Sequence, residues 1–316
     1  MGKYILKRLG TSLLIIFLVS VFSFSLMHIL PGDPVRISLG ESASEEKIQQ
    51  VREAYNLNKP IVEQYFLWIK GIVQGDFGRS LLYEEDVSAL IRAKLPITMS
   101  IGIPVLVIAS VLGIVFGILT AVKRGTWVDQ IITFIANIGI GCPEFWIAIL
   151  AILIFGIRLK WLPTQGYVAP DKDFSKYLYL AVLPVSCLAF RFIAMITRQT
   201  RSNMLDIINQ DYIRTARANG LAERKVIFRH ALKNALIPVI TIIGLQVRII
   251  VSGSVIIERI FNIPGLGQLL MRGIMERDYF IVQACVFVIT LITVGANLVV
   301  DILYGIVDPR VRKSWR

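Results

Sequence analysis

The segment DYIRTARANGLAERKVIFRHALKNALIP, residues 211–238, separates two apolar stretches that are each long enough to cross a bilayer. Together with the flanking Arg201 it carries seven Lys/Arg residues against two acidic residues. Residues 215–219 favour a helix, and Gly220 stands where a helix C-cap would place a glycine. A second helical run, residues 221–235, follows at once. We therefore expect a helix–glycine–helix unit, which we call the bracket (residues 211–238).

The residues of the bracket are compatible with two roles. A stiff lever that receives force from a partner protein needs slim helices with charges for docking, and Ala216, Ala218, Arg214 and Arg217 meet that need. A solvated basic loop of the positive-inside kind needs only the positive charge. The residues by themselves leave both interpretations open.

The composition predicts a polytopic all-α membrane protein that lies in a lipid bilayer. The chain has 316 residues, of which 55% are AVILMFWYC, and its mean hydropathy is +0.66. The net charge of +12 lies in loops and tails on alternate sides of the apolar runs, which argues against nucleic acid as a partner. Cys142, Cys187 and Cys285 fall within apolar runs at no metal-ligand spacing, so we interpret them as packing residues.

Six transmembrane helices are predicted, with both termini cytoplasmic. The expected spans are residues 9–30, 97–122, 131–156, 177–196, 235–257 and 279–307. The basic leader at Lys3, Lys7 and Arg8 keeps the N-terminus inside, and we expect the first apolar run to be retained rather than cleaved. Gly113 and Gly117, four residues apart, predict close packing of the second span against a neighbour.

The chain divides into four parts. These are a leader with the first span (1–30), an extracytoplasmic segment (31–95), a core of five spans that contains the loop 201–234 (96–307), and a basic cytoplasmic tail (308–316). The extracytoplasmic segment carries ten acidic against eight basic residues, in contrast to the basic loops opposite. It predicts helices that start near Ser44 and cover residues 61–73, which we expect to offer a docking face outside the membrane.

Polar residues inside the predicted spans mark candidate functional positions. Pro143 and Glu144 predict a helix break in the third span, where Glu144 is either a gate residue or an internally paired carboxyl. The candidates for a translocation path are Arg191, Gln246, Arg248 and Ser252. A positive charge at this depth either meets a substrate carboxylate or pairs with Glu144 or a partner group.

Two further features lie near the C-terminus. Residues 258–278 carry balanced charges around an apolar centre, and we expect a re-entrant or interfacial hairpin. Asp301, near the inner end of the last span, is expected to make a helix-packing contact rather than to relay protons.

An ordered set of motifs gives the chain a resemblance to a known family. The motifs are residues 30–34 (LPGDP), 75–80 (GDFGRS), 121–125 (AVKRG), 162–166 (LPTQG), 211–221, 229–235, 261–267 (FNIPGLG) and 301–310 (DILYGIVDPR). Together they resemble the dipeptide/oligopeptide/nickel permease family of ABC importers. The first motif and the long outer segment resemble the first permease of the pair, the dipeptide/oligopeptide permease B-like subunit.

The resemblance implies the type I ABC importer permease fold in a prokaryotic cytoplasmic (inner) membrane. It implies a second homologous permease subunit, two ABC ATPase subunits and an extracytoplasmic substrate-binding protein as partners. ATP and Mg²⁺ would bind to the ATPases, and this chain would be a transport subunit with no catalytic residue, cofactor or metal of its own. The chain agrees, because it contains no phosphate-binding G-x-x-x-x-G-K-[ST] motif.

The resemblance also assigns a role to the first half of the bracket, as the coupling helix of residues 211–221 that docks into an ATPase. The implied coupling residues are Asp211, Tyr212, Arg214, Thr215, Ala216, Arg217, Ala218, Gly220 and Leu221. At three of these positions, residues 214–216, Arg-Thr-Ala stands where the general importer motif has Glu-Ala-Ala. The peptide-permease variant of that motif fits the chain better.

Di- and oligopeptides are the cargo that the resemblance favours, with nickel complexes, glutathione and oligosaccharides as alternatives. A secondary transporter is a distant alternative, since it usually shows internal repeats and none is visible here. A membrane-embedded enzyme is a further alternative function. His28 and His230, the two histidines, lie near opposite membrane faces, and no catalytic triad spacing is present.

Overall fold

The computed structural model describes residues 2–29, 35–36, 44–80 and 82–307. Within these ranges the named elements are all helices, and one β-bridge joins Arg79 to Asp86. The predicted motif at residues 30–34 and the predicted tail at 308–316 lie outside the described residues.

Four helices are long and apolar enough to cross a membrane: α1 (Gly2–Ile29), α5 (Val87–Val122), α8 (Phe174–Ile208) and α13 (Tyr279–Val307). Two bent pairs satisfy the same test. One joins α6 (Trp127–Gly141) to α7 (Glu144–Ala151) and its π-helical continuation η1 (Ile152–Arg158). The other runs from α10 (Glu223–Lys225) through η2 (Val226–Ala231) into α11 (Leu232–Ile260). If each pair counts as one span, the described residues contain the six that the sequence predicts.

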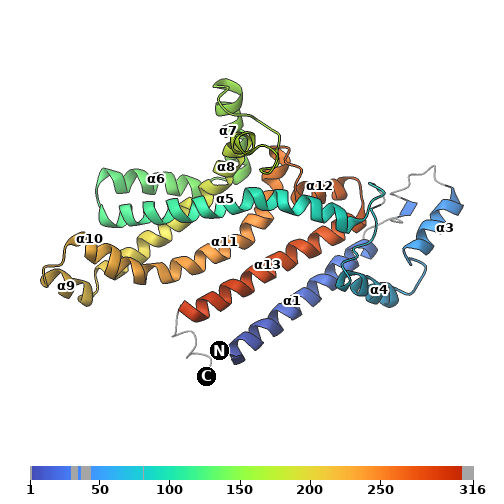
Figure 1. Cartoon of the computed structure of the whole chain (residues 1–316), viewed down its shortest axis with the longest axis horizontal. Coiled ribbons are helices and arrows are strands. Elements are labelled where there is room, and N and C mark those ends of the chain that lie inside the picture. The colour runs from blue at the N-terminus through green and yellow to red at the C-terminus, as the bar shows by residue number, and fades with distance from the viewer. Residues whose placement is uncertain (1, 30–34, 37–43, 81, 308–316) are drawn as a thin grey trace.

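The bracket and the outer segment lie at opposite ends of the molecule. Figure 1 shows α9 (Asp211–Ala218) and α10 at one end of the long axis, and α3 (Glu45–Ala54) and α4 (Ile61–Val73) at the other. Helices α5, α8 and α11 contact one another in the centre, and α1 packs along α13 beside them. This order agrees with the predicted cytoplasmic and extracytoplasmic positions of the two segments.

Small residues bring α5 and α8 unusually close together. A Cβ atom on Gly113 would lie 2.6 Å from Cβ of Ile196, and one on Gly117 would lie 2.4 Å from Cβ of Thr200. Only glycine fits at these two crossing points. The predicted close packing of this glycine pair is therefore confirmed, and α8 is the partner helix.

The helix that contains the second span begins before the predicted span does. The predicted start was residue 97, but α5 begins at Val87, so the end of the predicted extracytoplasmic segment is helical. Arg92 and Lys94 in these first turns made the sequence look like a polar loop. A helix of 36 residues is about 54 Å long, which exceeds the ~30 Å hydrocarbon core and lets its first turns extend beyond the membrane.

The third span is not a single straight helix. The chain bends by 109° between its two halves, so the break predicted at Pro143 is present. After this bend α7 does not continue in the direction of α6. Pro143 has φ −61° and ψ 139° and precedes the first residue of α7, where proline ends one helix and starts the next. The 15 residues of α6 cover only about 22 Å, so this helix alone is shorter than the bilayer core.

The bracket continues directly into the fifth span. The sequence predicts a helical run to residue 235 and a separate span after it, whereas helical structure runs unbroken from Glu223 to Ile260. A bend of 51° lies next to Pro238, where the segment Glu223–Leu236 joins the segment Pro238–Val247. The second arm of the bracket thus continues directly into a candidate membrane helix.

The outer helices match their predicted positions. Helix α3 starts at Glu45, directly after Ser44, and α4 has the predicted limits. Helix α4 lies against α1, where the hydroxyls of Ser20 and Tyr65 are 2.7 Å apart. About two turns further along α1, His28 Nε2 is 3.2 Å from Gln64 Oε1. The outer segment is therefore anchored to the first span.

Candidate coupling site and transport path

Helix α9 ends in a glycine C-cap, as the sequence predicts. Gly220 has φ +75°, a left-handed conformation that residues with a Cβ adopt only with strain. Its N–H donates to the carbonyl of Arg217 (2.9 Å), and the N–H of Leu221 donates to that of Ala216 (3.4 Å). These bonds satisfy the last carbonyls of α9 and turn the chain sharply into α10.

One face of α9 is buried in the protein itself. Ile213 and Ala216 lie in an apolar cluster with residues of α5, α8, η2 and α11: Ile118, Ala121, Met204, Val226, Ile227, Ala231 and Ala235. Ala216 therefore faces the interior, although the sequence interpretation assigned it to a surface for the partner. The cluster holds α9 rigidly against the ends of three membrane helices.

Polar contacts join the two arms of the bracket. The Arg217 guanidinium donates to both carboxylate oxygens of Glu223, at 3.0 and 2.6 Å. These hydrogen bonds raise the pKa of Arg217 above its ordinary value. On the other side, the Asn234 amide donates to the Tyr212 hydroxyl at 2.9 Å. Arg217 and Tyr212 thus stabilise the bracket internally.

The outer face of α9 is polar and exposed. Seven of the nine predicted coupling residues are solvent-exposed, namely Asp211, Tyr212, Arg214, Thr215, Arg217, Ala218 and Gly220, while Leu221 is half-buried. The Arg214 side chain is 71% exposed, and its contact with Asp211 is 3.6 Å long. Arg214 is therefore the most accessible cation for docking among the predicted coupling residues.

An ion pair that the sequence interpretation missed ties α8 to α6. Arg201 donates to Asp129 through Nε and Nη2, each at 2.9 Å, and Asp129 is nearly buried. Asp129 also accepts from the Gly125 N–H and the Thr133 hydroxyl. The sequence feature that could have indicated this ion pair is Asp129 itself, a single acidic residue between the 121–125 motif and an apolar run.

The predicted path residues lie in different environments. Glu144, at the start of α7, and Arg191, on α8, are both half-buried. Gln246, on α11, is buried, and its amide nitrogen lies 3.8 Å from the Met195 sulfur. Pro143 is exposed at the bend. The positions of Arg248 and Ser252 lie within α11, but their side chains are outside the described part of the structure.

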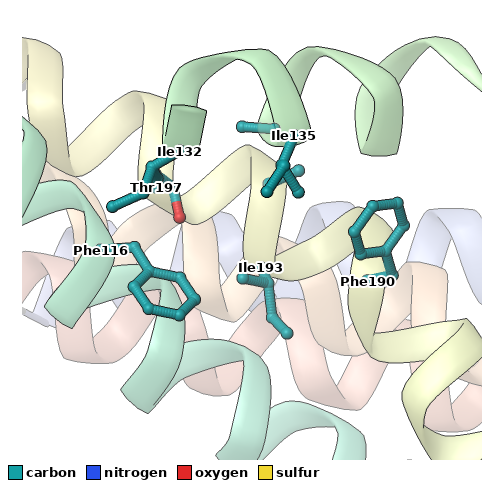
Figure 2. Close-up of a pocket in the computed structure, with 8 residues that line it drawn as sticks. Phe116, Ile132, Ile135, Phe190, Ile193 and Thr197 are labelled. Carbon is teal, nitrogen blue, oxygen red and sulfur yellow. The ribbon is translucent and has the colours of Figure 1, made fainter. Parts of the chain in front are cut away.

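A cavity of about 160 Å³ lies between α5, α6 and α8 (Figure 2). It is lined by Phe116, Ile132, Ile135, Ala136, Phe190, Ile193, Ala194 and Thr197. The Thr197 hydroxyl is the one polar side-chain group in this lining. None of the predicted path residues contributes to this cavity.

A buried carboxylate organises the C-terminal half of the fold. Glu258 is fully buried and accepts from the Thr98 hydroxyl at 2.7 Å and from the Gln268 N–H at 3.0 Å. It thereby links α5, α11 and α12 (Leu266–Met275). A Cβ on Gly265 would lie 2.6 Å from this carboxylate, which explains why the first of the two glycines in the 261–267 motif is needed. The predicted hairpin is thus a helix–turn–helix built on Glu258.

Asp301 and the cysteines contribute to helix packing in the described part of the chain. Arg8 Nη1 lies 2.9 Å from Asp301 Oδ2, so Asp301 joins α13 to α1 as a helix-packing contact. Cys187 and Cys285 are buried and unbonded, as expected of packing residues, and Cys142 is half-buried and also unbonded.

The fold defines a polytopic helical membrane protein with a packed helix–glycine–helix unit at one end. The chain belongs to the family described as the binding-protein-dependent transport system inner membrane component, which matches residues 113–313. The N-terminal model of the same transport systems matches residues 1–102. The chain is thus an integral inner membrane protein and a permease subunit of an ABC importer.

Curated relatives match over nearly the whole chain. The oligopeptide transport system permease protein AppB of Bacillus subtilis is 40% identical over 98% of this chain and 99% of its own length. A putative peptide transport system permease of Brucella abortus is 39% identical over 99% of each chain. The glutathione transport system permease GsiC of Escherichia coli K12 is 38% identical over 99% of each. These matches confirm the predicted family.

Proposed function

We propose that this chain moves di- and oligopeptides as one of two permease subunits of an ATP-driven importer. The full-length similarity to peptide permeases carries this proposal. Glutathione, the cargo in the name of one relative, is itself a small peptide, so it lies within the same chemical class. Nickel complexes and oligosaccharides remain alternative cargoes, because a delivering binding protein would make most of the selection.

Peptide delivery requires partners on both sides of the membrane. A substrate-binding protein docks on the extracytoplasmic side, where the outer segment offers α3 and α4. Two ABC ATPases dock on the cytoplasmic side and hold all of the ATP and Mg²⁺, so this chain needs no cofactor or metal. A second, homologous permease completes the path. Both termini of this chain lie in the cytoplasm, in agreement with the basic leader and tail.

The exposed face of α9 receives the force of ATP-driven closure. Arg214, Asp211 and Thr215 contact a cleft of the ATPase, and Arg214 pairs with an acidic group there. The buried face of α9 passes the displacement to α5, α8 and α11 through the cluster around Ile213. A rigid packed cluster moves as a unit, because a close-packed interior has little room to deform.

The transport path passes the polar residues of the central spans. Arg191, Gln246, Arg248 and Ser252 line it, and Pro143 and Glu144 form a gate at the bend between α6 and α7. A charge or amide in a span is costly against lipid, so these side chains are better placed beside water or a partner chain. The half-buried state of Arg191 and Glu144 supports this placement.

Reconstitution tests the proposed function. The chain, co-expressed with its neighbouring transport genes, should copurify with a second permease and two ATPases. Proteoliposomes that contain this complex and the binding protein should accumulate radiolabelled tripeptide only with ATP. Uptake of a nickel complex or an oligosaccharide, with no uptake of peptide, would replace the proposed cargo. ATP-independent uptake driven by an ion gradient would remove the importer assignment altogether.

The docking role of Arg214 has a direct test. Arg214→Glu should strongly weaken capture of the ATPases by the tagged permease, because it places a negative charge opposite an acidic site. Arg272→Glu makes the same change at an exposed residue of α12, on the opposite side. Equal ATPase capture by both variants would exclude Arg214 from the contact.

A further inference from the structure

A second cavity, of about 190 Å³, lies where the outer segment meets α1 and α13. It is lined by Phe24, Ala54, Tyr55, Asn56, Leu57, Gln64, Leu67, Trp68, Asp76, Phe77, Gly78, Phe280 and Gln283. Its walls therefore combine residues of α1 and the outer segment with residues of α13. Ligand pockets for whole small molecules are usually about 300–1,000 Å³, so this volume suits the end of a longer molecule.

Aromatic rings form much of the cavity wall. Tyr55 and Phe280 lie with ring centroids 4.4 Å apart, and Phe24 and Trp68 lie 5.9 Å apart. Phe77 is a fifth lining ring. The faces of such rings carry partial negative charge and attract organic cations. Several rings around one small space are the arrangement that proteins use to hold an ammonium group.

The charges of the lining point to the same ligand chemistry. Asp76 is exposed, and its carboxylate is the one formal charge among the lining residues. One Asp76 oxygen accepts from the Gly78 N–H at 2.8 Å. The lining would therefore attract a cation, and it contains no cationic side chain to pair with a phosphate or carboxylate group.

Gln283 adds a hydrogen-bond donor to this cavity. The residue is only 4% exposed, and its amide nitrogen has no hydrogen-bond partner among the described residues. A buried donor without a partner is costly, so such groups mark sites where a ligand supplies the acceptor. The amide nitrogen of Gln64, by contrast, already donates to the carbonyls of Leu57 and Lys59.

We propose that this cavity binds the N-terminal end of a peptide on the extracytoplasmic side. The α-ammonium group lies among the aromatic rings near Asp76, and the first peptide carbonyl accepts from the Gln283 amide. A ligand that carries a cation close to a neutral hydrogen-bond acceptor satisfies both parts of the lining. The cation suits the aromatic rings and Asp76, and the acceptor suits the Gln283 amide. This inference rests on the proposed function, because it takes peptide as the cargo class.

The test uses the purified importer complex in nanodiscs of phosphatidylglycerol, which contains no amine. Trialanine binding is measured by saturation-transfer NMR, with N-acetyl-trialanine as the matched ligand without the ammonium group. We expect the acetylated peptide to bind about tenfold more weakly. Gln283→Leu, which has a similar shape, and Asp76→Asn, which keeps an oxygen for Gly78, should each weaken trialanine binding about tenfold.

Two control variants make the same kinds of change elsewhere. Thr200→Val also removes a buried polar group without a partner, and Asp171→Asn also removes an exposed carboxylate. Both should bind trialanine like the unmodified complex. Equal binding of the free and acetylated peptides, or unchanged binding by Gln283→Leu and Asp76→Asn, would overturn the site.

The uptake assay separates this result from the proposed function. If proteoliposomes take up peptide and the cavity variants bind it normally, only the site is wrong. If the complex transports no peptide while the variants still weaken trialanine binding, the site stands and the peptide-import function fails.

Discussion

Arg201 on α8 and Asp129 on α6 form a bidentate ion pair, with both N–O distances at 2.9 Å. The pair joins the helix that leads into the bracket to the first turn of its neighbour. Asp129→Asn leaves the partly buried guanidinium with a neutral partner, so we expect a loss of about 1–3 kcal/mol in the free energy of unfolding. Thermal denaturation of the detergent-solubilised protein, followed by tryptophan fluorescence, measures this loss.

The solvent-accessible pair of Lys59, just before α4, and Glu63, in its first turn, is the matched control, with an N–O distance of 2.9 Å. Glu63→Gln should change stability by less than about 1 kcal/mol, because water already solvates both charges. Indistinguishable melting temperatures for Asp129→Asn and Glu63→Gln would contradict a stabilising role for the Arg201 pair.

The contact between Gly265 and Glu258 predicts that an added methyl group is not tolerated. In Gly265→Ala the new Cβ would lie 2.6 Å from the Glu258 carboxylate, which has no room to move because it is fully buried. We expect a destabilisation of about 1–3 kcal/mol, measured by the same denaturation assay. Gly10→Ala, where nothing lies within 4 Å of the new Cβ, should be neutral or stabilising. A stable Gly265→Ala protein would refute the Glu258 packing.

The positive φ of Gly220 predicts a defect in coupling rather than in folding alone. Gly220→Val strains the turn between α9 and α10 by about 1–3 kcal/mol and misaligns the docking face. We expect ATP hydrolysis to continue while peptide uptake per ATP falls. Gly125→Val is the control, since Gly125 has φ +80° and nothing within 4 Å of a Cβ, as at Gly220 (φ +75°). If both variants lower the uptake-to-hydrolysis ratio equally, the bracket is not the coupling element.

The proposed path predicts uptake defects at the basic residues of the spans. Arg248→Ala and Arg191→Gln should each reduce peptide uptake by about tenfold if they meet a substrate carboxylate, while ATPase capture is unchanged. Lys160→Ala, at an exposed residue beyond the π-helical turn after α7, should have no effect. Normal uptake by the Arg248→Ala variant would exclude that residue from the path.

The pairing alternative for Glu144 makes a different prediction. If Arg191 and Glu144 act only as a structural pair, Glu144→Gln and Arg191→Gln lower the melting temperature, and the double variant costs little more than either one. If Glu144 is a gate, Glu144→Gln alters uptake at unchanged stability. A double-mutant cycle that includes both measurements distinguishes the two roles.

The sequence alone determined the class of membrane protein, the number of apolar segments and the helix–glycine–helix form of the bracket. These features are local: hydropathy over about 20 residues and a glycine at a helix end are properties of short stretches. The ordered motifs identified the family for the same reason. The first turns of α5 were missed because Arg92 and Lys94 have the composition of a loop although they lie in a helix.

Only the tertiary structure decided which side of each helix faces inward. Ile101 and Ile103 lie on the same helix, yet the first is 1% and the second 58% exposed. In a membrane both lipid and protein interior are apolar, so the pattern of apolar residues does not mark the buried face. The inward position of Ala216, the Arg201–Asp129 pair and the burial of Glu258 depend on contacts between residues far apart in the sequence, and helix packing alone brings those residues together.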